Sequence, residues 1–73
     1  DSELAEKAYL KSLASSPGFA PSYKSLGILH LKNDQNELSL FYFKKYIELA
    51  PESSDRGYIE GYIAQLEQSR SRP

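Results

Sequence analysis

The sequence has no cysteine, methionine, valine, threonine or tryptophan, and its single histidine is His30. Without cysteine the chain forms no disulfide and offers no thiolate to a metal, and one histidine excludes a multi-histidine metal site. The formal net charge of −1 provides no basic stripe for nucleic acid. No apolar run approaches the roughly 20 residues that cross a bilayer. We therefore expect no cofactor, no nucleic-acid partner and no membrane insertion.

The residues that are present favour helix. Ten leucines and six alanines stand against four isoleucines, which are the only β-branched residues of the chain. Leucine and alanine lose little rotamer freedom in a helix. A length of 73 residues allows one domain with a thin core. Because the chain begins Asp1-Ser2-Glu3, without an initiator methionine, we expect a processed form or a domain of a longer protein.

Prolines, glycines and polar turns divide the chain into four expected helices. Apolar residues at a spacing of three and four predict a helix over residues 3–15, which Pro17 and Gly18 end. Proline is tolerated in a first helical turn, so a second helix is expected from Pro21 through residue 32. We predict an all-α fold.

The second half of the chain gives equally local signals. The polar segment 33–36 is a turn of the length that joins antiparallel helices, and a third helix is expected over residues 37–49. Within it, Leu40 and Phe43 are assigned to the core, whereas the position of Tyr42 stays open. Residues 53–55 offer N-caps for a last helix, and the tail from Ser69 is expected to fray. The apolar face of the last helix is expected to consist of Ile59, Tyr62, Ile63 and Leu66.

The chain also repeats itself at an offset of 34 residues. This offset pairs Glu3 with Glu37, Leu4 with Leu38, Tyr9 with Phe43, Lys11 with Lys45, Leu13 with Ile47 and Pro17 with Pro51. A period of this length in a helix-turn-helix chain is typical of tetratricopeptide arrays. The middle segment resembles the motif of the tetratricopeptide repeat (TPR) family through Tyr23, Leu26, Gly27, Ser39, Phe43 and Pro51.

The resemblance implies an antiparallel helix-turn-helix stack, a fragment of a right-handed superhelix. Residues 3–17 would be the second helix of a partial repeat, 20–53 a full repeat and 54–70 a C-terminal capping helix. In such a repeat Gly27 lets the two helices approach closely, with Tyr23 and Phe43 filling the gaps on either side. The sequence departs from the motif where His30 replaces an aromatic residue and Tyr46 replaces a small one. The register of the last helix stays open between offsets of 34, which aligns Gly61 with Gly27, and 35, which aligns Tyr58 with Tyr23.

The function that the resemblance implies is the binding of a protein or peptide segment, without catalysis. The first helix of each repeat lines a concave groove in this family. Because Ile28 stands where an asparagine would complete a carboxylate clamp, a mixed apolar and weakly basic groove is expected instead. The groove residues implied in this way are Lys24, Ile28, Leu31 and Lys32, joined by Tyr58 and Tyr62 if the last helix follows the offset of 34.

Two alternatives remain open. Fewer than three repeats are usually unstable alone, and the first helix carries apolar residues on two sides, so the chain is also interpreted as a self-associating scaffold piece that forms homo-oligomers. Its last third also resembles, loosely, the end of TPR modules in bacterial envelope proteins, including some attached to M48-type zinc peptidases. Any metal site of such a protein would lie outside these residues.

Catalytic interpretations have little support. The segment His30-Leu31-Lys32 faintly resembles the phosphoacceptor region of histidine phosphotransfer domains, but Asn33 stands where that family has lysine. We expect His30 instead to pack, partly buried, between helices. The serines form no nucleophile motif. Two carboxylate pairs, Glu48 with Glu52 and Asp55 with Glu60, are expected to be solvated.

Overall fold

A computed structural model describes residues 1–70 and consists of four helices joined by short turns. They are α1 (Ser2–Ser15), α2 (Ala20–Lys32), α3 (Asn36–Leu49) and α4 (Arg56–Arg70). Each helix packs antiparallel against the next one along the chain. The all-α prediction is confirmed, and the expected helix bounds agree within two residues in the first three helices. The expected fraying is wrong for Ser69 and Arg70, which belong to α4, while residues 71–73 lie outside the described residues.

The helix ends follow local chemistry. The carboxylate of Asp1 accepts a hydrogen bond from the backbone N–H of Glu3 and caps α1. Pro21 lies in the first turn of α2, as expected. After α2 the backbone adopts a positive φ of 57° at Asp34, and the N–H of Gln35 bonds to the carbonyl of His30. In this kind of turn, a residue in the left-handed conformation allows an N–H group after the helix to bond to one of its last carbonyls. Aspartate tolerates that conformation better than most residues.

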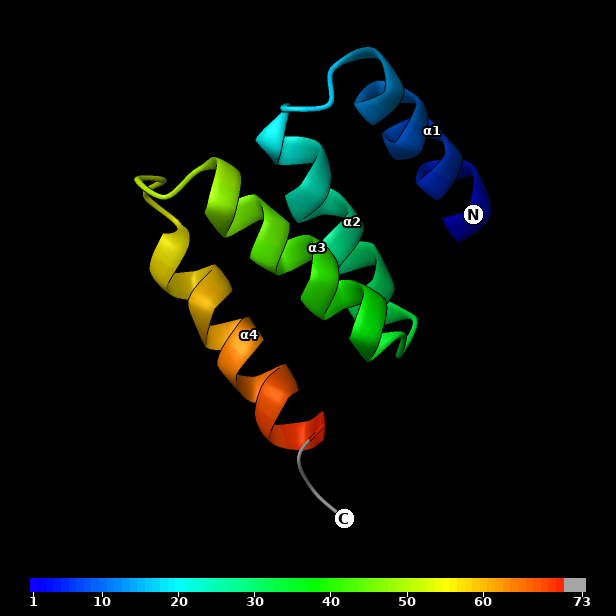
Figure 1. Ribbon diagram of the computed structural model, residues 1–73. Coiled ribbons are helices and arrows are strands. Elements are labelled where there is room, and N and C mark those ends of the chain that lie inside the picture. Colours follow the sequence, from blue (N-terminus) through cyan, green and yellow to red (C-terminus); the bar gives the residue numbers. More distant parts are fainter. Residues whose placement is uncertain (71–73) are drawn as a thin grey trace.

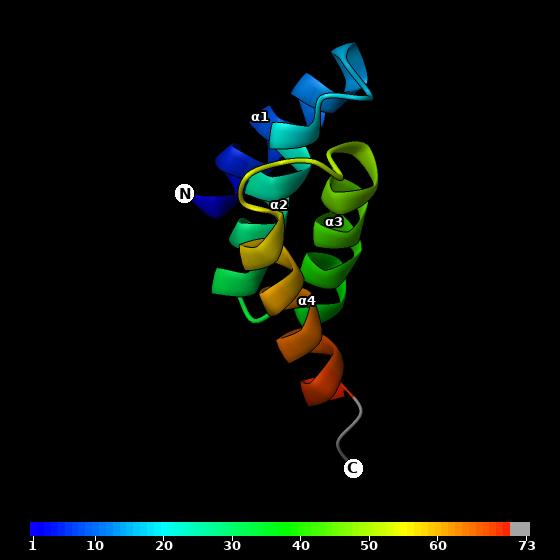
Figure 2. The same cartoon turned by 90° about the vertical axis from the view of Figure 1, so that its left-hand side faces the viewer.

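The helices form a thin slab with dimensions of 38 × 30 × 14 Å. In Figure 1, α1 and α4 lie at opposite ends, with α2 and α3 between them. Figure 2 shows α2 and α3 side by side, with α4 crossing in front of them. Within residues 1–70, no helix is both long enough and apolar enough to span a bilayer.

The core lies between the last three helices. Leu40, Phe43 and Tyr46 of α3 pack against the buried side chains of α4, and the expected core positions Leu40 and Phe43 are 4% and 0% exposed. The predicted apolar face of α4 is confirmed, because all of its residues contact this core. They are Ile59, Tyr62, Ile63 and Leu66.

The crossing of α2 and α3 explains Gly27. A Cβ atom at this position would lie 2.5 Å from Cδ1 of Phe43, far inside the usual 3.5–4.0 Å carbon contact. The hydroxyl of Ser39, which is completely buried, donates a 2.7 Å hydrogen bond to the carbonyl of Gly27. The close approach expected at Gly27 is therefore present, and a small hydroxyl residue fits beneath it.

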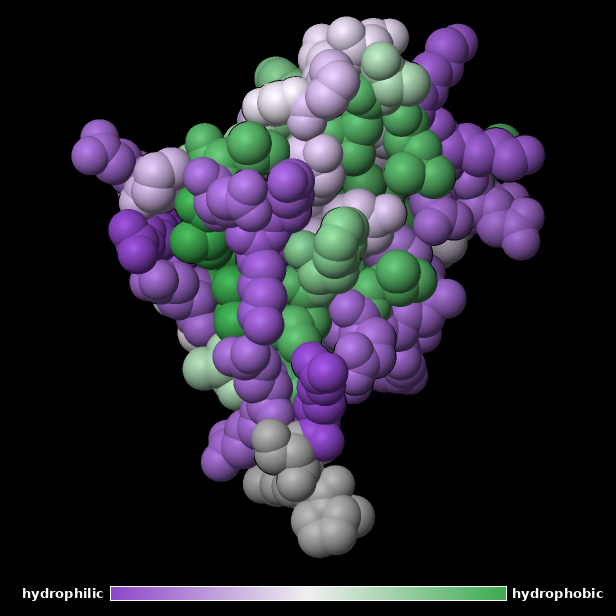
Figure 3. All heavy atoms as spheres, in the orientation of Figure 1, coloured by the Kyte–Doolittle hydropathy of each residue, from purple (hydrophilic) through white to green (hydrophobic). Residues whose placement is uncertain are grey.

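Helix α1 is the least buried element, since it contributes no buried side chain. Leu4 and Leu10 are 66% and 43% exposed, as expected for a helix with apolar residues on two sides. On α3, Leu38 and Phe41 are also exposed. Figure 3 shows apolar side chains gathered over α3 and beside α1 on this face, interrupted by polar ones.

Candidate binding surface and the contacts that hold it

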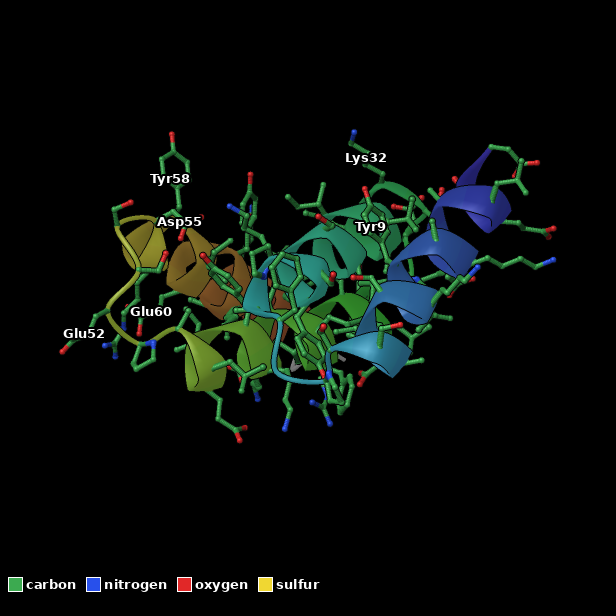
Figure 4. The ribbon with its side chains drawn as sticks, turned by 90° about the horizontal axis from the view of Figure 1, so that it is seen from above. Tyr9, Lys32, Glu52, Asp55, Tyr58 and Glu60 are labelled. Carbon is green, nitrogen blue, oxygen red and sulfur yellow. The ribbon has the colours of Figure 1, made fainter. Side chains whose placement is uncertain are left out.

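The expected groove residues divide into an exposed set, a packed set and Lys24, which forms an ion pair. Ile28 and Tyr58 are 36% and 77% exposed, and Lys32 is exposed as well. Figure 4 shows that Lys32 of α2 and Tyr58 of α4 project to the same side of the molecule. This exposed set, Ile28, Lys32 and Tyr58, is called the α2–α4 face below.

The packed set supports the core. Leu31 and Tyr62 are half-buried and pack against the core cluster. The ring of Tyr62 stacks on Phe43 with a centroid distance of 5.5 Å and an interplanar angle of 10°. Only part of either side chain is therefore available to a partner.

Lys24 forms an ion pair that the sequence did not predict. Its Nζ lies 2.7 Å from Oδ2 of Asp55, in the turn before α4, with the two side chains 35% and 28% exposed. The ion pair joins α2 to the beginning of α4 and neutralises the cation that was expected to face the groove. The expectation that Asp55 is merely solvated is wrong.

Asp55 is the centre of a hydrogen-bond network. Its carboxylate accepts hydrogen bonds from Lys24, from the hydroxyl of Ser53 and, at 2.7 Å, from the hydroxyl of Tyr46. In order of importance, Lys24, Ser53 and Tyr46 hold the pKa of Asp55 well below its usual range, because all three stabilise the charged form. The hydrogen bond to Asp55 in turn raises the pKa of Lys24. The phenol of Tyr46, a residue where the TPR motif has a small one, thus has a polar partner.

The other carboxylates of the expected pairs lie near the surface. Glu60 accepts from Arg56 at 3.2 Å, and Glu48 lies 3.5 Å from Lys45 with its side chain 68% exposed. Glu52 is exposed. These three carboxylates agree with the expectation of solvated charge.

His30 is more deeply buried than expected, with 3% of its surface exposed. Its ring stacks on Tyr42 at a centroid distance of 5.4 Å, which answers the open question about Tyr42: this residue is half-buried against α2. Burial, followed by the charge of Glu6, raises the pKa of the Tyr42 phenol. Nδ1 of His30 lies 2.7 Å from Oε1 of Gln35.

No group of three or more histidine, cysteine, aspartate or glutamate side chains within residues 1–70 is arranged to hold a metal ion. Comparisons of the chain with models of known protein families, with curated proteins and with solved structures found no match.

Proposed function

We propose that this chain is a TPR-like helical stack that binds a partner protein or peptide segment without catalysis. The crossing of α2 and α3 supports the proposal, because Gly27 and Phe43 meet as the motif implies and Ser39, another motif position, bonds to the carbonyl of Gly27. Antiparallel packing of successive helices is also what a stack of helical hairpins requires.

The observation that carries the proposal is the exposed α2–α4 face. Ile28 and Tyr58 offer apolar and aromatic contact area, and Lys32 adds a cation at the same side. Tyrosine provides large contact area at low conformational cost, so an exposed one is suited to binding. The Lys24–Asp55 ion pair links α2 to the turn before α4, which supports a face that is formed before a partner arrives.

Selection from a random peptide library displayed on phage tests this function. We expect enriched peptides to bind the purified chain and to lose binding to an Ile28→Asp/Tyr58→Ala variant. A Phe41→Ser variant is the matched control, because Phe41 is 59% exposed but lies on α3. Unchanged far-UV circular dichroism establishes that each variant is folded. Equal peptide binding by the α2–α4 variant and the control, or no enrichment, contradicts the proposal.

A second candidate function is head-to-tail self-association, and Gly61 of α4 favours it. At an offset of 34 residues Gly61 corresponds to Gly27 and Tyr9 corresponds to Phe43. The space above Gly27 is filled by Phe43, whereas a Cβ on Gly61 would meet nothing within 4 Å. Helix α1 of a second copy would place Tyr9 against Gly61 and repeat the α2–α3 contact.

Sedimentation velocity over a wide concentration range distinguishes the two functions. Self-association predicts a sedimentation coefficient that rises with concentration, and a Gly61→Leu variant that stays monomeric and folded. Gly18→Leu is the matched control, since Gly18 also has open space around it but lies in a turn. A monomer at all concentrations excludes self-association and leaves the partner-binding function.

A further inference from the structure

A pocket of about 370 Å³ lies where the beginning of α1 meets the end of α2. Its volume is within the range of small-ligand sites, roughly 300–1,000 Å³. It is separate from the α2–α4 face, so an inference about it goes beyond the proposed function. The lining residues are Ser2, Glu3, Glu6, Leu29, His30, Asn33 and Gln35.

The buried His30 gives this pocket a polar atom without a hydrogen-bond partner. Nε2 lies 3.3 Å from a carboxylate oxygen of Glu6, but the contact does not have hydrogen-bond geometry, and within residues 1–70 Nε2 has no other partner. In the tautomer whose Nδ1–H donates to the side-chain amide oxygen Oε1 of Gln35, Nε2 presents its lone pair to the carboxylate. Two acceptors then face each other, and a donor from a ligand would satisfy both.

The charge of the pocket selects a cation. Two carboxylates, those of Glu3 and Glu6, line it, and neither a lysine nor an arginine is among its lining residues. The beginning of α1 and the end of α2 both lie at the pocket, and their opposite partial charges offset each other, so the two carboxylates set the sign of its charge. The side-chain amide of Asn33 adds a further acceptor to the lining, whereas the amide oxygen of Gln35 already contacts Nδ1 of His30.

A metal ion is a poor match for this pocket, because within residues 1–70 no three histidine, cysteine, aspartate or glutamate side chains, including Glu3, Glu6 and His30, are arranged to hold one. An organic cation with several N–H donors fits better. A guanidinium carries five donors in one plane and is more weakly hydrated than an ammonium, so it bridges separate acceptors at lower desolvation cost. We propose that the pocket between α1 and α2 binds a guanidinium group, such as the side chain of an arginine.

The side chain of Glu6 makes this binding sterically possible. It is 38% exposed, so we expect it to turn from Nε2 of His30 toward a ligand, whereas His30 itself contacts Tyr42 and Gln35. Glu6 is therefore the residue expected to contribute most to the affinity.

An NMR titration of the whole chain tests the proposal. The probe is N-acetyl-L-arginine N-methylamide, and the reporter is the ring of His30, which is unambiguous because the chain has one histidine. The citrulline derivative is the matched neutral ligand, and the lysine derivative replaces the guanidinium by an ammonium. Glu6→Gln and Glu3→Gln remove one carboxylate each, and Glu52→Gln, an exposed change in the turn before α4, is the control.

We expect the arginine derivative to shift the His30 signals saturably and the lysine derivative to bind more weakly. Glu6→Gln should weaken binding about tenfold, as expected for the loss of one charged hydrogen bond, while Glu52→Gln leaves it unchanged. Citrulline binding of equal strength, equal effects of Glu6→Gln and Glu52→Gln, or the absence of any shift at His30 would overturn the proposal. Free L-arginine distinguishes the source: weaker binding than the derivative indicates an arginine within a peptide, and tighter binding indicates the free amino acid.

Discussion

Replacing Gly27 by alanine tests the helix crossing on which the fold depends. The new Cβ would lie 2.5, 2.6 and 3.0 Å from three ring atoms of Phe43, so the ring must move by about 1 Å. Phe43 is completely buried and stacked on Tyr62, which leaves the ring little room to move. Overpacking of this kind costs about 1–3 kcal/mol, and the better helix propensity of alanine returns about 1 kcal/mol. The two terms together give a net loss of about 0–2 kcal/mol of unfolding free energy, and because the ring has little room to move we expect the upper half of that range, about 1–2 kcal/mol.

Gly61→Ala is the matched control, because it lies within α4 and a Cβ there meets nothing within 4 Å. Only the propensity term applies, so this variant should gain about 0.5–1 kcal/mol. Urea denaturation followed by far-UV circular dichroism measures both free energies. The opposite sign of the two changes is the result that matters, since a general effect of replacing glycine would give the same sign.

A double variant identifies the cause of the loss. Phe43→Leu removes the ring atoms that the new methyl group meets, so Gly27→Ala should cost less in that background than in the wild type. A Gly27→Ala protein as stable as the wild type, or the same cost with and without the ring, would refute the steric reasoning.

Two further predictions concern the polar contacts. The lowered pKa of Asp55 means that its contribution to stability is present above the ordinary carboxyl pKa of about 4 and is lost as the pH falls toward the lower folded-state value. Asp55→Asn should therefore lower the free energy of unfolding at neutral pH, and the variant should lose less stability than the wild type on acidification. Parallel acid-denaturation curves of the variant and the wild type would contradict this. His30→Phe keeps the stacking on Tyr42 and removes the unpartnered Nε2, so we expect the free energy of unfolding to change by less than about 1 kcal/mol. A collapse of helicity would mean that the contacts with Gln35 and Glu6 are essential.

Local signals in the sequence were sufficient for the four helices. A proline in a first turn, a polar turn before Asn36 and an apolar spacing of three and four depend on residues close in the chain. The close approach at Gly27 followed from the resemblance to a motif within one helical hairpin, and the burial of Phe43 followed from the helix side that it shares with Leu40. Each of these features is fixed within one helical hairpin, so no contact between distant segments had to be known.

The tertiary structure decided which polar groups meet. Lys24 and Asp55 are 31 residues apart, and their contact depends on how α4 is placed and rotated relative to α2, which no local pattern specifies. The same holds for Glu6 against His30, which joins α1 to α2. A rotation of a helix by one residue, about 100°, exchanges a buried side chain for an exposed one while leaving the helix itself unchanged. The sequence by itself therefore determined the helices and one helix crossing, and the packing of separate helices determined the ion pair at Asp55 and the pocket at His30.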